Sequence, residues 1–171
     1  TSNGNSCNGA EFYYKRNSYN LTFNDGKKIV KDEKVKYEAT LGSYDFVPEM
    51  PTELYEAGSR EFGGWYLNPE CTGIEYKLSQ HTMPADNVLL YAKWVPVNRT
   101  VKTWLTDKMG TPVNVGDTGS NVQTIPHGSF ATKPDDPKNG SYTFVGWFYT
   151  ENDEEKAFDF SMPVNRDLNL Y

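Results

Sequence analysis

The chain has 171 residues, is 15% aromatic and 37% hydrophobic, and carries a net charge of −6 with a pI near 4.9. This acidic balance disfavours nucleic acid, heparin-like polymers and anionic membranes as partners, because those surfaces attract fields of lysine and arginine. No stretch approaches the ~18 apolar residues of a membrane-spanning helix, so we expect no membrane insertion. The chain begins at Thr1 without a methionine, which indicates a processed form or a fragment.

The first part of the chain predicts a polar tail followed by a β-hairpin. Residues 1–10 are polar and contain two Asn-Gly steps, which is typical of a flexible tail. Strand-forming residues over 11–23 lead into the Asn-Asp-Gly turn signal at 24–26, and a returning strand is expected over 29–37. Residues 52–57 then predict a short helix, which needs packing to persist.

Later segments predict further strands and one polar turn. Strands are expected over 61–67, near 74–78 and over 88–94. In the second half, Val101, Thr103 and Leu105 alternate with Lys102 and Trp104, which predicts a strand with one covered face. The acidic run 151–155 lacks the Asp-x-Asp-x-Asp-Gly spacing of a calcium loop, so we interpret it as a solvated hairpin turn.

One signature occurs twice and divides the sequence. The first copy reads Phe62-Gly63-Gly64-Trp65-Tyr66, then Met83-Pro84, then Leu90-Tyr91. The second copy reads Phe144-Val145-Gly146-Trp147-Phe148, then Met162-Pro163, then Leu170-Tyr171. The tryptophans, methionines and final tyrosines are 82, 79 and 80 residues apart, and a period near eighty with matching landmarks predicts two related modules in tandem.

The repeat predicts the domain organisation. After the tail we place module 1 at 11–94 and module 2 at 95–171. The join over 94–99 is short and contains proline, which favours a stiff connector over a floppy tether. Module 1 continues past its Leu-Tyr pair, so we expect the last strand of module 2 to be cut short at Tyr171.

The two copies differ most in the region of the expected helix. Pro48 and Pro51 match Pro134 and Pro137 at a step of 86, which falls to 82 at the tryptophans. Module 1 therefore holds four extra residues between Pro51 and Phe62, and we expect any activity private to one module there.

Three stretches carry a family resemblance: 142–148 (Tyr-Thr-Phe-Val-Gly-Trp-Phe), 90–94 (Leu-Tyr-Ala-Lys-Trp) and 14–19 (Tyr-Lys-Arg-Asn-Ser-Tyr). Together they resemble the internalin-type B repeat, or Listeria–Bacteroides repeat, of bacterial surface proteins, over nearly all of the chain after the tail. The resemblance implies a strand-dominated α+β fold of two β-grasp, ubiquitin-like modules. The chain departs from the family pattern at Glu61, where module 2 has Thr143.

The resemblance also implies a role outside a bacterial cell, on a secreted or wall-attached protein. Such repeats act as spacers or adhesive modules, and the family offers no catalytic residues to carry over. We therefore expect a non-catalytic stalk without cofactors that contacts neighbouring repeats and a host protein or a glycan. The alternative is a carbohydrate-binding module appended to a secreted enzyme.

The repeated signature has a structural and a functional interpretation. Trp65 and Trp147 either anchor the core of each module or form platforms on which sugars stack. We favour the core, because both copies keep the same flanking pattern. The residues assigned to this structural signature are Phe62, Gly64, Trp65, Leu90, Tyr91, Phe144, Gly146, Trp147, Leu170 and Tyr171.

Tyrosines outside that signature are better ligand candidates. A tyrosine combines a flat apolar face with a hydroxyl, which suits recognition of a glycan or a protein. The alternative for each ring is ordinary cross-strand pairing on a sheet. The candidates are Tyr13, Tyr14, Tyr55, Tyr66 and Tyr149.

The remaining reactive residues predict neither an active site nor a metal site. His81 and His127 lie in different modules at unmatched positions, without the spacing of a catalytic set. Cys7 and Cys71 allow one bridge from the tail to module 1 or two free thiols, and neither stands in a CxxC motif.

Overall fold

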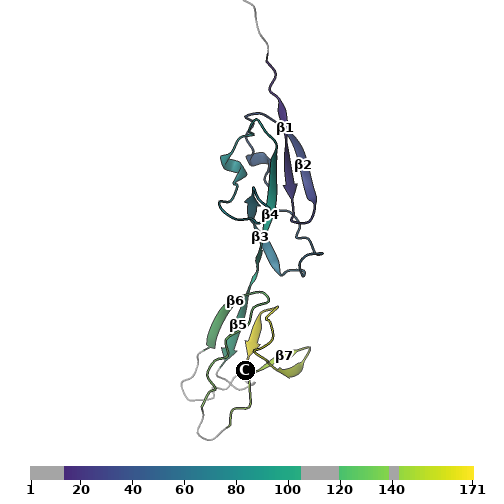
Figure 1. The fold of residues 1–171 in the computed structure, drawn as a ribbon. Helices are drawn as coiled ribbons and strands as arrows, with labels where there is room; N and C mark the ends of the chain where they lie inside the picture. The colour runs from purple at the N-terminus through teal and green to yellow at the C-terminus, as the bar shows by residue number, and fades with distance from the viewer. Residues whose placement is uncertain (1–13, 105–119, 139–142) are drawn as a thin grey trace, which may run out of the picture. The chain divides into compact units, whose positions relative to one another are not determined.

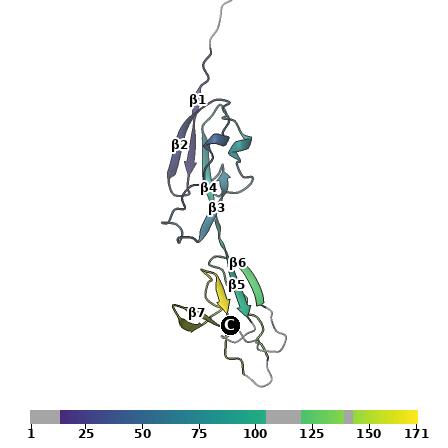
Figure 2. The same ribbon diagram turned by 180° about the vertical axis from the view of Figure 1, so that it is seen from behind.

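A computed structural model describes residues 14–104, 120–138 and 143–171 (Figures 1 and 2). The described residues form strands, turns and two short 3₁₀ helices, which agrees with the expected strand-dominated class. They pack as two compact units. Unit 1 takes in the chain up to Glu49 together with Gly64–Lys93, and unit 2 takes in Met50–Gly63 together with Trp94–Tyr171. The tail predicted over 1–10 lies outside the described residues.

Unit 1 is built on a four-stranded sheet with the order β2-β1-β4-β3 (Figure 1). Its strands are β1 (Ser18–Asn24), β2 (Ile29–Lys36), β3 (Arg60–Tyr66) and β4 (Val88–Pro96). Strand β1 pairs antiparallel with β2 and parallel with β4, so a late strand lies beside the first one. The division between the units falls within β3 and β4.

The predicted hairpin between β1 and β2 is confirmed, and its turn residues explain it. Asp25 donates its backbone N–H to the Lys28 carbonyl at 3.0 Å. Its carboxylate accepts the N–H groups of Lys27 and Lys28 at 2.8 and 2.7 Å. Gly26 has a φ of 98°, a conformation that glycine adopts without the steric cost of a Cβ. Asp25 is 2% exposed, so its bonds to the turn satisfy a buried polar group.

Three aromatic rings form the centre of unit 1. Phe23 lies 4.8 Å from Trp65 and 5.1 Å from Phe46, both in edge-to-face contact. Edge-to-face pairs add about 0.5–1.5 kcal/mol to the effect of burial. The helices η1 (Gly42–Tyr44) and η2 (Leu78–Gln80) are 3₁₀ turns on the segments between strands.

Unit 2 contains a three-stranded sheet with the order β6-β5-β9 and a separate hairpin. The sheet strands are β5 (Asn98–Trp104), β6 (Ser120–Pro126) and β9 (Leu168–Leu170). The hairpin is formed by β7 (Phe148–Glu151) and β8 (Glu154–Ala157). Phe148 and Tyr171 exchange backbone hydrogen bonds at 3.0 and 2.9 Å, which joins the start of β7 to the end of β9.

The same strand pairing recurs in both units. Leu21 of β1 is the parallel partner of Val88, and Val101 of β5 is the parallel partner of Leu168. Val101 follows Leu21 by 80 residues, and Leu168 follows Val88 by the same number. The side chains just before these pairs repeat as well, because Asn87 accepts the backbone N–H of Asn20 and Asp167 accepts that of Thr100, each at 2.8 Å.

The methionines of the two signatures are not structurally equivalent. Met83 donates its N–H to the Ala39 carbonyl at 2.9 Å, and in unit 2 the same bond runs from Val164 to Ser129 at 2.8 Å. Met83 and Val164 are each 1% exposed, whereas Met162 is 58% exposed. Matching Met83 with Met162 by sequence is therefore wrong, because the connecting segments differ in length and bring Val164 into the core position.

Replacing Met83 with alanine is expected to destabilise unit 1 by about 2–5 kcal/mol, because it leaves a cavity in a closed core. The matched change Met162→Ala is expected to alter stability by less than about 0.5 kcal/mol. Denaturant unfolding of the two variants measures this contrast. Equal losses of stability would show that Met162 occupies the core position after all.

Two expected elements are corrected. The helix predicted over 52–57 is a single turn, in which Leu54 and Tyr55 donate to the Pro51 carbonyl at 3.0 and 3.2 Å. Six residues are too few to sustain a helix whose exposed side chains find little packing. The strand predicted near 74–78 is irregular, and Tyr76 donates one hydrogen bond, of 2.7 Å, to the Trp65 carbonyl.

Residues 50–63, where module 1 holds its four extra residues, belong to unit 2. Gly58 accepts a hydrogen bond from Arg99 Nη2 at 2.7 Å, and Ser59 accepts the N–H of Val97 at 3.0 Å. His127 Nδ1 accepts a hydrogen bond from Arg99 Nε at 3.2 Å. The other ring nitrogen, Nε2, lies 3.3 Å from a carboxylate oxygen of Glu56. These contacts give the extra segment a structural role within unit 2.

Candidate functional site

The signature tryptophans are both buried, Trp65 at 2% and Trp147 at 3% exposure. Trp65 Nε1 donates to the Phe46 carbonyl at 3.3 Å. Trp147 Nε1 finds no hydrogen-bond partner within the described parts of the chain. A ring with so little exposed surface does not offer a face to a sugar, so the placement supports the core interpretation.

The glycines before these tryptophans have positive φ angles, 100° at Gly64 and 145° at Gly146. At Gly64 this φ favours glycine, and a Cβ there would also lie 2.8 Å from the flexible Glu75 side chain, which would have to move.

The other signature residues surround the two cores. Leu90 and Leu170 are fully buried, and Tyr171 is 39% exposed. Tyr91 is half-buried. Phe144 is also half-buried and packs on Trp147 at 5.4 Å, whereas Phe62 packs on Trp94 at 6.0 Å.

The five candidate tyrosines have different surroundings. Tyr13 lies outside the described residues, and Tyr14 is 91% exposed. Tyr66 is only 8% exposed, so the expectation of a surface ring there is wrong. Tyr55 and Tyr149 are half-buried, with the guanidinium groups of Arg60 and Arg166 at 5.0 and 5.4 Å from their ring centroids. Of these rings, Tyr149 lines two hollows of the surface.

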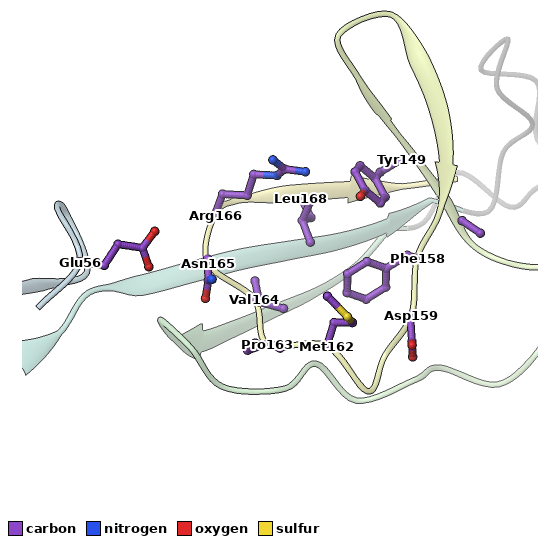
Figure 3. A pocket seen from close by; sticks show the side chains of 11 residues that line it. Glu56, Tyr149, Phe158, Asp159, Met162, Pro163, Val164, Asn165, Arg166 and Leu168 are labelled. Atoms are coloured by element: carbon purple, nitrogen blue, oxygen red, sulfur yellow. The ribbon is translucent and has the colours of Figure 1, made fainter.

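The first hollow beside Tyr149, of about 520 Å³, is mostly apolar and is here called the apolar hollow (Figure 3). Figure 3 shows Phe158, Met162 and Val164 along one side of it and Arg166 at the other end. Val164 is buried and Phe158 half-buried, so the hollow rests on the core of unit 2.

The second hollow, of about 510 Å³, is here called the polar hollow. It shares Tyr149, Arg166 and Leu168 with the apolar hollow. Its other lining residues are mainly polar: Thr150, Glu151, Asn152, Asp167, Asn169 and Tyr171. Both volumes fall in the range of about 300–1,000 Å³ that is usual for small-ligand pockets.

The β7–β8 hairpin positions the wall of the polar hollow. Asn152 and Asp153 have φ angles of 52° and 63°, which is the geometry of a tight two-residue turn between antiparallel strands. Asparagine and aspartate tolerate this left-handed backbone better than most residues. The prediction that the acidic run 151–155 forms a hairpin turn is therefore confirmed.

A carboxylate between two cations organises the rim of the polar hollow. Glu151 accepts a hydrogen bond from Lys156 Nζ at 2.7 Å and another from Arg166 Nη1. These two hydrogen bonds hold the pKa of Glu151 below its ordinary value of 4.5, and the bond from Lys156 is the larger of the two causes. In turn, Glu151 raises the pKa of Lys156. The ion pair between Glu151 and Arg166 holds the guanidinium over the Tyr149 ring, 5.4 Å from its centroid.

We expect the charge on Glu151 to persist to lower pH than that of an ordinary glutamate. Since its folded pKa is lowered, its contribution to stability is fully present above about pH 4.5 and is lost as the pH falls through the folded pKa. Lys156→Ala and Arg166→Ala should each move the pKa of Glu151 back towards 4.5, because the hydrogen bonds from Lys156 and from Arg166 both hold it down. Carboxyl-carbon NMR titration measures this, and an ordinary pKa in the unaltered chain would contradict it.

Two further polar side chains of the polar hollow accept hydrogen bonds from strand β5. Asp167 uses one oxygen to accept the backbone N–H of Thr100 at 2.8 Å. Asn169 uses its amide oxygen to accept the indole N–H of Trp104 at 3.2 Å. The second oxygen of Asp167 and the amide N–H₂ of Asn169 retain hydrogen-bonding capacity.

Unit 1 has no equivalent of this rim at the matching positions. Counted from the tryptophans, Tyr149 matches Leu67, and counted from the parallel strand pairs, Arg166 and Asn169 match Asp86 and Leu89. Both hollows therefore depend on side chains that the two units do not share.

The reactive residues named from the sequence do not assemble into a catalytic set in the described chain. His81 stacks on Tyr76 at 4.1 Å, and burial raises the pKa of the Cys71 thiol above its ordinary value, which weakens it as a nucleophile. Within residues 14–104, 120–138 and 143–171, no three His, Cys, Asp or Glu side chains form a group that could hold a metal ion. Cys7 lies outside these ranges, so both alternatives, a bridge to Cys71 and two free thiols, stay predictions.

Sequence reasoning found Tyr149 but missed its neighbours. The sequence pattern predicts only a solvated turn around Glu151 and carries no signal for Arg166, Asp167 and Asn169. Their residue types are ordinary for a surface, and the strand pairing that gathers them joins segments more than sixty residues apart.

Comparison with known proteins agrees with the repeated architecture. The sequence profile of the Listeria-Bacteroides repeat domain matches residues 19–93 and 113–171. A protein of Evansella cellulosilytica that carries the provisional name of a membrane protein is 30% identical over 158 residues, which cover 91% of this chain. The chain spans about a fifth of that relative's length. Among the described residues, no helix has the length and apolar character needed to cross a membrane. The chain belongs to the Listeria-Bacteroides repeat family, a typically non-catalytic repeat family of bacterial surface proteins.

Proposed function

We propose that this chain is a non-catalytic pair of repeat modules of a bacterial surface or secreted protein, and that it serves as a spacer and an adhesive segment. The observation that carries this proposal is the repetition of one sheet pairing in two compact units, each with its own buried tryptophan. Repeated modules of this kind extend a surface protein without requiring a catalytic site. Family membership supports the extracellular setting.

The proposal includes a β-grasp fold for each module. A first hairpin joined through a parallel contact to a late strand is the pairing expected of a β-grasp sheet, and unit 1 has it in the order β2-β1-β4-β3. Unit 2 repeats the hairpin and the parallel contact with β6, β5 and β9. The described part of the chain lacks the helix that usually crosses such a sheet, and turns take its place.

The adhesive role rests on unit 2, where the two hollows offer an aromatic ring and polar groups at the surface. The nearest alternative, a binding module attached to a secreted enzyme, would use the same hollows. The two differ in what the parent protein carries, not in the chemistry of this segment.

Surface accessibility tests the proposal. An antibody raised against the folded chain should bind intact bacteria that carry the parent protein, and added protease should remove the epitope without lysis. In-frame removal of the segment should reduce attachment of the cells to their target surface while the neighbouring domains stay folded. Detection only after lysis, with a cytoplasmic protein released in parallel, would contradict the proposed location.

A further inference from the structure

We propose that the polar hollow of unit 2 is a binding site for a neutral sugar residue of a glycan. The inference rests on the adhesive part of the proposed function and names the ligand class and the residues. The central elements are the Tyr149 ring, the Arg166 guanidinium and the hydrogen-bonding side chains Asp167 and Asn169.

The lining of this hollow matches the chemistry of a pyranose. A sugar ring has an apolar face of C–H groups and an edge of hydroxyls, each of which donates and accepts hydrogen bonds. Tyr171, which is 39% exposed, and Tyr149 line the hollow with aromatic surface, and the Arg166 guanidinium lies over the Tyr149 ring at 5.4 Å from its centroid. Asn152 and Asn169 supply amides, Asp167 an acceptor and Arg166 donors, so both halves of each hydroxyl can be satisfied.

The groups are positioned before any ligand arrives. Arg166 is fixed by its ion pair with Glu151, which Lys156 also holds at 2.7 Å. Asp167 and Asn169 are fixed by the Thr100 backbone and the Trp104 indole. Side chains that are already ordered lose less conformational entropy on binding, which matters for a weak ligand such as a sugar.

Charge favours a neutral sugar over an acidic one. The charged residues that line the hollow are Glu151, Asp167 and Arg166, and Lys156, which pairs with Glu151 at 2.7 Å, brings the local sum of charges to zero. The guanidinium is already paired with Glu151, and the whole chain carries a net charge of −6. A uronate or sulfated glycan would therefore find both cations already paired and would approach against the negative charge of the whole chain, whereas uncharged hydroxyls meet no such cost.

NMR titration of the ¹⁵N-labelled chain with defined oligosaccharides tests the proposal. The probes are chitotriose, cellotriose, maltotriose and mannotriose, with trigalacturonate as the acidic comparison. At least one neutral probe should shift the amide signals of Tyr149, Asn152 and Asn169 saturably, with a dissociation constant of about 0.1–1 mM. Trigalacturonate should bind at least about tenfold more weakly.

Matched variants locate the site. Tyr149→Ala and Arg166→Ala should each weaken binding about tenfold or more, while Tyr149→Phe keeps the ring and should retain most of it. Leu67→Ala alters the equivalent position of unit 1, which is 60% exposed, and should leave binding unchanged. Unchanged spectra elsewhere show that each variant is folded.

The outcomes separate this proposal from the proposed function. Absence of saturable shifts with every neutral probe at about 10 mM, tighter binding of trigalacturonate, or shifts confined to other residues would each overturn the sugar site. None of these results would affect the antibody and protease test of surface display. Failure of that test would instead remove the setting in which the site acts.

Discussion

Trp147→Ala is expected to unfold unit 2 while unit 1 stays folded. Trp147 is 3% exposed and lies in a small core with Val101, Val164 and Leu170. Removing a buried tryptophan costs about 3–5 kcal/mol, which reaches the lower end of the whole stability of a unit of about 80 residues, at roughly 0.05–0.15 kcal/mol per residue. Amide spectra resolved by residue, recorded through a denaturant titration, follow the two units separately.

The mirror variant supplies the control. Trp65→Ala should remove the structure of unit 1 and leave the signals of unit 2 in place. Of the milder variants Trp65→Phe and Trp147→Phe, Trp65→Phe should cost more stability. Trp65 Nε1 donates to the Phe46 carbonyl at 3.3 Å, and only this variant loses that hydrogen bond. If Trp147→Ala kept its unfolding midpoint and lost only a ligand, the ring would be a binding platform and not a core anchor.

Phe23→Ala is expected to destabilise unit 1 by about 3–5 kcal/mol. Phe23 is fully buried and makes edge-to-face contacts with Phe46 and Trp65. Its loss leaves a cavity in the middle of the aromatic cluster and removes both ring contacts. Denaturant unfolding of unit 1, monitored through its own amide signals, gives the change in free energy.

Unit 2 offers a matched control at the same place in the sheet. Thr103 stands 80 residues after Phe23, is 2% exposed, and donates its hydroxyl to the Asn121 carbonyl at 3.4 Å. Thr103→Ala removes a small group and one long hydrogen bond, so a loss of about 1 kcal/mol in unit 2 is expected. A similar cost for both changes would mean that the aromatic cluster adds nothing to the stability of unit 1.

Local signals in the sequence predicted the first hairpin, the strands β3, β4 and β5 and both tight turns, whereas the strand expected near 74–78 does not form and β6 was not predicted. The Asn-Asp-Gly turn and the acidic turn form because each is encoded by a few adjacent residues with a fixed backbone preference. The segment 52–57 shows the limit of such signals, since a six-residue helix depends on packing that only the fold supplies. The same limit explains why Met162 was matched with Met83. Both methionines precede a proline in the sequence, but Met83 is buried and Met162 is exposed.

The sequence by itself determined the repeat period, the strand-dominated class and the family, because these depend on the order and spacing of residues along the chain. Only the tertiary structure decided that Val164 takes the place of Met83 and that Tyr66 is buried. It also decided that Arg166 is held by Glu151 beside Tyr149, with Asp167 and Asn169 on the same rim. The physical reason is that burial and side-chain convergence depend on strand register and loop length, which bring together residues that carry no local signal.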